Sequence, residues 1–93
     1  MEGNNVNEIL ERTIRDMEEE LELFDDNKTW HISKMEGIEK AIDLLKRDGE
    51  KEADAIAALD EVYDQHLSKV EQCENHMMRL EDNIERYKKL LNA

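Results

Sequence analysis

The chain has 93 residues, no proline and three glycines, and 41% of its residues are charged, a composition typical of long helices or coiled coils rather than of a compact mixed fold. Its formal net charge is −12, so it has no general excess of basic side chains with which to neutralise phosphates. We therefore expect no direct binding to nucleic acid, and attraction to anionic lipid is disfavoured for the same reason.

Targeting and compartment follow from simple features of the chain. Residues 1–5 show no basic stretch followed by an apolar run, so we expect no secretory signal. No apolar run approaches the ~18 residues that would cross a bilayer. The single cysteine, Cys73, has no intramolecular disulfide partner, which fits a reducing compartment. These features predict one cytoplasmic domain spanning residues 1–93.

The first predicted helix runs from about residue 5 to residue 47. Asn5 is a suitable N-cap with Glu8 three residues later, and Lys46 and Arg47 suit the negative end of the helix dipole. Its seam follows the three- and four-residue spacing of positions a and d of a heptad repeat lettered a to g. Position a holds Ile14, Leu21, Lys28, Met35 and Ile42, and position d holds Leu10, Met17, Phe24, His31, Ile38 and Leu45.

A turn at about 48–50 and a second helix at about 51–92 are expected to follow. Gly49 is a natural left-handed residue for closing the first helix. The second seam has the same spacing and comprises Ile56, Leu59, Tyr63, His66, Val70, Cys73, Met77, Leu80, Ile84, Tyr87 and Leu91. So short a turn makes the helices antiparallel, and pairing residues whose numbers add up to 101 aligns the two seams. The predicted fold is an all-α, two-helix coiled-coil hairpin.

One stretch of the first helix leaves an alternative open. Residues 25–29, Asp-Asp-Asn-Lys-Thr, compete for backbone hydrogen bonds and prefer caps to helix interiors. A break there would produce a three-helix bundle. Against a break, Phe24 and His31 stay in phase with the heptad, and we favour the continuous helix.

Catalytic and metal chemistry have little support in the sequence. The three glycines are isolated, no Glu-x-x-His pair is present, and no serine lies in a nucleophile-elbow motif, so we predict no enzyme and no cofactor. Cys73 and His76 have the spacing of a ligand pair, but no cluster of four ligands exists. We therefore predict no metal site and interpret Lys28, His31 and His66 as polar seam residues that set register.

Two surface features remain as candidates for function. The first is an acidic patch without a basic residue: Asp16, Glu18, Glu19, Glu20, Glu22, Asp25 and Asp26. Such a patch favours a partner with a basic surface, and one function it allows is mimicry of nucleic acid that blocks a nucleic-acid-binding protein. The usual alternative is a solvated helix face.

The second feature lies at position c, outside the predicted seam. It is a stripe of apolar residues and one glycine, interrupted by Asp16, which we name the outer stripe: Ile9, Leu23, Trp30, Gly37 and Leu44. Regular apolar side chains outside a buried seam favour an interface over scattered surface hydrophobes. We therefore expect a non-enzymatic protein-interaction module, a small acidic regulator or adaptor. We expect it to bind another protein and to self-associate as a dimer in a four-helix bundle.

Overall fold

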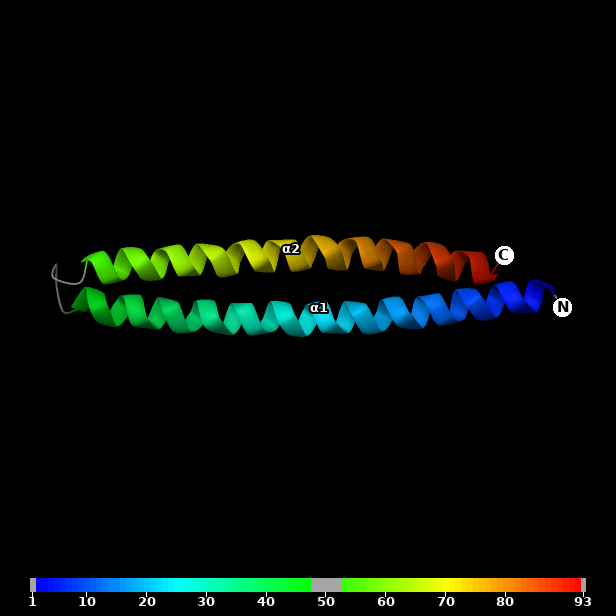
Figure 1. The fold of residues 1–93 in the computed structure, drawn as a ribbon, viewed down its shortest axis with the longest axis horizontal. Coiled ribbons are helices and arrows are strands. Elements are labelled where there is room, and N and C mark those ends of the chain that lie inside the picture. The colour runs from blue at the N-terminus through cyan, green and yellow to red at the C-terminus, as the bar shows by residue number, and fades with distance from the viewer. Residues whose placement is uncertain (1, 48–52, 93) are drawn as a thin grey trace.

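The computed structural model describes residues 2–47 and 53–92, which form two antiparallel helices lying side by side with both chain ends at the same end (Figure 1). Helix α1 spans Glu2–Arg47 and helix α2 spans Ala53–Asn92. The molecule is a rod of 73 × 14 × 14 Å. The predicted all-α hairpin is therefore confirmed.

The seam predicted from the heptad spacing is the core of the rod. Every predicted a and d residue of both helices is buried or partly buried. The most buried residues are spread along the rod: Ile14, Met35, Ile42, Val70, Cys73, Leu80 and Ile84. The core is a single line of side chains because two helices can cover only one stripe of each other.

Contacts between the helices agree with the expected antiparallel alignment. The ring centroids of Phe24 and His76 lie 4.4 Å apart, and the Tyr63 hydroxyl donates a 2.9 Å hydrogen bond to Oε1 of Glu39. The residue numbers of these pairs add up to 100 and 102, one on each side of the predicted 101. The hydrogen bond stabilises the protonated phenol, and together with burial and nearby carboxylates it raises the pKa of Tyr63.

The three-helix alternative is wrong, because α1 continues without a break through residues 25–29. The polar side chains there find partners that leave the backbone helical. The Thr29 hydroxyl donates a 3.0 Å hydrogen bond to the carbonyl of Asp25, one turn earlier. Lys28 Nζ lies 3.5 Å from Oε1 of Glu74 on α2, and the Asn27 amide contacts Cys73 Sγ at 3.9 Å.

The helix bounds differ from the prediction at the first end. Helix α1 begins at Glu2, so Asn5 lies inside the helix rather than capping it. An exposed asparagine costs a helix only a fraction of a kcal/mol, about 0.7 at most, and does not force the helix to start there. The end at Arg47 matches the prediction, whereas the predicted turn at 48–50 and the start of the second helix at 51 lie outside the described residues.

Candidate protein-binding surface

The outer stripe lies on the exposed side of α1. The exposed fractions are 63% for Ile9, 68% for Leu23, 51% for Trp30 and 59% for Leu44. Gly37 is also exposed, and a Cβ atom added at that position would have nothing within 4 Å. The stripe predicted from the sequence is thus a row of uncovered apolar side chains with an open notch at Gly37.

Trp30 is the least exposed of these large side chains because it leans on the polar centre of the seam. Its ring meets His31 edge-on at 4.9 Å between centroids and His66 at 5.9 Å. Lys34 Nζ lies 5.2 Å from the centre of the indole ring, a cation–π distance. Contacts from both helices therefore orient Trp30 while leaving about half of its surface open.

The contact beneath Trp30 is a histidine pair that the sequence did not predict. Nδ1 of His31 and Nδ1 of His66 lie 2.8 Å apart, a hydrogen bond in which one ring donates and the other accepts. The predicted alignment places His31 opposite Val70 and His66 opposite Met35, so these rings bridge two adjacent layers. Burial, the charge of His66 and the charge of Lys69 lower the pKa of His31.

The cysteine and the remaining histidine do not form a common site. Cys73 is buried in the seam, whereas His76 packs on Phe24 and has Nε2 3.9 Å from Oε1 of Glu20. Within residues 2–47 and 53–92, no three histidine, cysteine or carboxylate side chains lie where they could hold one metal ion.

The acidic patch surrounds α1 rather than lying along one face. All seven of its residues are exposed, and they occupy heptad positions b, c, e, f and g, which together make up the whole perimeter outside the seam. Arg79 and Arg86, the cations expected to balance the patch from α2, take part in no ion pair among the described residues. The patch concentrates negative charge around residues 16–26 of α1.

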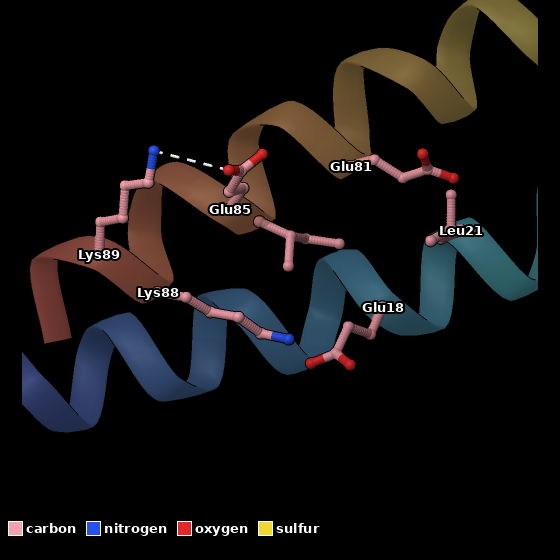
Figure 2. A pocket seen from close by; sticks show the side chains of 7 residues that line it. Glu18, Leu21, Glu81, Glu85, Lys88 and Lys89 are labelled. Atoms are coloured by element: carbon pink, nitrogen blue, oxygen red, sulfur yellow. Dashed lines mark ion pairs between the residues drawn. The ribbon is translucent and has the colours of Figure 1, made fainter. Parts of the chain in front are cut away.

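At one point the acidic patch borders a shallow groove between the helices. Leu21 and Ile84 form its floor, and Glu18, Glu81, Glu85, Lys88 and Lys89 form its rim. Lys88 extends from α2 toward Glu18 on α1, while Lys89 pairs with Glu85 at 3.5 Å within its own helix (Figure 2). The rim thus contains both signs of charge.

Further exposed apolar side chains lie outside the outer stripe. Met78 and Leu90 on α2 are more than half exposed, and Ile32, Val62 and Leu67 are less so. They form no regular row: Val62 and Leu90 share a heptad position but lie four heptads apart, and Ile32, Leu67 and Met78 lie elsewhere. They provide natural controls for substitutions in the stripe.

No helix in the described parts of the chain combines the length and apolar character needed to cross a membrane. Comparisons with protein-family models, with curated proteins and with solved structures find no match to this chain. The function has to be inferred from the surface of the hairpin.

Proposed function

We propose that this protein is a non-enzymatic interaction module, a small acidic coiled-coil regulator or adaptor that acts by binding another protein and by self-association. The outer stripe is the proposed interface. The observation that carries the proposal is Trp30, a large aromatic side chain that is 51% exposed although it is held by contacts to both helices.

An aromatic side chain that is already held in place loses little conformational entropy when a partner covers it. Tryptophan is enriched among the residues that dominate binding energies for this reason and for its large apolar area. Leu23 and Leu44 lie on the same face and extend the apolar area along α1. The narrow core supports the same proposal, because small scaffolds with little core are often completed by association.

The test is the substitution Trp30→Asp in the full chain, compared with Met78→Asp on α2. Both side chains are more than half exposed, so neither substitution should unfold the hairpin. We expect Trp30→Asp to convert dimer to monomer in light scattering, or to abolish partner capture, while Met78→Asp does neither. If Trp30→Asp changes neither self-association nor capture, the stripe is ordinary surface.

The alternative function, an acidic mimic of nucleic acid, is supported by the absence of any basic residue from Asp16 to Asp26. Replacing Glu18, Glu19, Glu20 and Glu22 by lysine should then abolish binding while Trp30→Asp leaves it intact. Salt separates the two functions as well. Capture through the acidic patch should fail in high salt, whereas capture through the outer stripe should persist.

A further inference from the structure

We infer that the outer stripe is self-complementary: α1 of one copy packs on α1 of a second copy, antiparallel, about a two-fold axis that passes beside Ser33. This inference rests on the proposed role of the stripe as an interface and names its occupant and alignment. Two independent features of α1 support the inference: the shape of the outer stripe and the charges that border it.

The shape of the outer stripe allows it to pair with a second copy of itself. If residues whose numbers add up to 67 face each other, Leu23 of one copy lies opposite Leu44 of the other, and Trp30 lies opposite Gly37. Two-fold symmetry repeats both contacts, as an isologous interface requires. The half-exposed indole ring then packs over the position where α1 has no side chain and nothing within 4 Å. The largest side chain of the stripe thus meets its only notch.

Charged residues at position f border the stripe on one side. In an antiparallel pair the same flank of both helices meets, so position f faces position f. The numbers of the facing position-f residues add up to 66, one residue or about 1.5 Å from the alignment of the stripe. Glu19 therefore lies beside Arg47 and Asp26 beside Lys40, with Ser33 next to its own copy at the axis. All five side chains are exposed, and none of the four charged residues forms an ion pair among the described residues.

These charges also determine the orientation of the two copies. A parallel pair would instead bring position f of one copy beside position g of the other, which holds Glu20, Asn27, Lys34 and Ala41. Glu20 would then lie near Glu19 and Asp26, which is a repulsive contact, and Lys40 would face Ala41 or Lys34. The antiparallel pair offers four opposite-charge contacts, two kinds repeated by the axis. Flanking charges set orientation in coiled coils in this way. The second copy is therefore the partner whose charge pattern fits this surface.

The pairing uses residues 19–47 of each α1, roughly 44 Å at 1.5 Å per residue, and Ile9 lies beyond it. Lys34, on the other flank, comes near its own copy at the axis. This repulsion opposes association, and the contact of each Lys34 with the Trp30 ring partly offsets it.

The first experiment uses the reversals Asp26→Lys and Lys40→Asp in separate full-length chains. Each alone places like charges opposite each other twice per dimer, and we expect dimerisation to weaken about tenfold in sedimentation equilibrium at low salt. Mixing the two variants restores both opposite-charge pairs in a heterodimer, so the mixture should associate about as tightly as the original chain. A mixture no tighter than the separate variants overturns the alignment.

The second experiment places a cysteine at the axis. Ser33→Cys should form a disulfide-linked dimer under mild oxidation, because position 33 faces itself within disulfide reach. Ser68→Cys, at the only other serine, lies on α2 away from the proposed contact and should not. Cys73 is buried in both chains. Equal cross-linking of the two variants, or none in either, overturns the proposal.

The outcomes separate this inference from the function on which it rests. If Trp30→Asp dissociates the dimer but the mixture and the cross-link fail, the stripe is an interface with a different alignment. If the chain is monomeric at all concentrations, the second copy is excluded, and the stripe is then tested only by capture of another protein.

Discussion

Nδ1 of His31 lies 2.8 Å from Nδ1 of His66, and the two rings link α1 to α2 at the polar centre of an otherwise largely apolar seam. A hydrogen bond between two imidazole nitrogens needs one protonated and one unprotonated atom. The pair accommodates one shared proton at this contact, whereas two would place N–H groups against each other. Adding the second proton would disrupt this contact, so the stability of the hairpin should depend on pH.

The stability of the hairpin should fall as the pH is lowered through the range below about 6.5, the ordinary pKa of histidine. The folded chain lowers the pKa of His31, so the unfolded chain binds more protons in this range and acid favours unfolding. The stabilisation is fully present above pH 6.5 and is lost toward the lower pKa of the folded state. Urea unfolding midpoints between pH 7.5 and 5 measure it.

Comparison of variants separates this effect from the many carboxylates, whose protonation also changes stability. His31→Leu should remove the part of the acid-induced loss of stability that depends on the histidine pair. His76→Gln should still show that loss, because His76 lies outside the pair. An identical pH dependence in the original chain and in His31→Leu would contradict the assignment.

Lys28→Leu should stabilise the hairpin at neutral pH. Lys28 occupies a seam position, and its ammonium group pairs with Glu74 at a site where the lysine side chain is still 29% exposed. Such a pair contributes little, whereas leucine at position a would extend the apolar seam. We expect a gain of about 1 kcal/mol in the free energy of unfolding, measured by urea titration.

The same substitution should weaken the uniqueness of the assembly, since polar seam residues set register and partner number. Lys28→Leu is therefore expected to broaden the distribution of oligomers in native mass spectrometry. A stability equal to or below that of the original chain would show that the Lys28–Glu74 pair contributes more than its exposure suggests.

Ile84→Ala should destabilise the hairpin far more than Leu23→Ala. Ile84 is buried in the seam, and deletion of a buried aliphatic side chain costs about 2–5 kcal/mol, with the lower end expected for so thin a core. Leu23 is 68% exposed, so the monomer should change by no more than about 0.5 kcal/mol. Thermal unfolding at concentrations that exclude association provides the comparison, and equal losses would contradict the assignment of Leu23 to the surface.

Gly37→Leu should have opposite effects on the monomer and on the dimer. Leucine favours helix over glycine by about 1 kcal/mol, and at this exposed position an added Cβ meets nothing within 4 Å in the single hairpin, so the monomer should become more stable. In the proposed dimer the new side chain would occupy the space of Trp30 from the other copy. Circular dichroism should show a higher melting temperature while sedimentation shows weaker association.

Gly37→Ala is the matched control for that result. Alanine improves helix propensity with a much smaller side chain, so it should stabilise the monomer while weakening the dimer less than leucine does. Tighter association of Gly37→Leu than of the original chain would mean that no ring packs over this position.

The seam, the antiparallel hairpin and the exposure of the outer stripe could be predicted from the sequence because each depends on local periodicity. Side chains three and four residues apart share a helix face whatever the rest of the chain does. Leu23 is therefore exposed and Ile84 is buried, as their heptad positions predict. The burial of such a stripe is also the main source of stability for helices of this length.

Tertiary structure alone decided the features that depend on the other helix. The continuity of α1 through residues 25–29 was open in the sequence, and α2 supplies Glu74 and Cys73 as partners for two of its polar side chains. The His31–His66 contact joins neighbouring layers, and side-chain rotamers set such a contact, not heptad spacing. Sequence periodicity determines which face of each helix is buried, and only the packed pair determines which side chains meet within it.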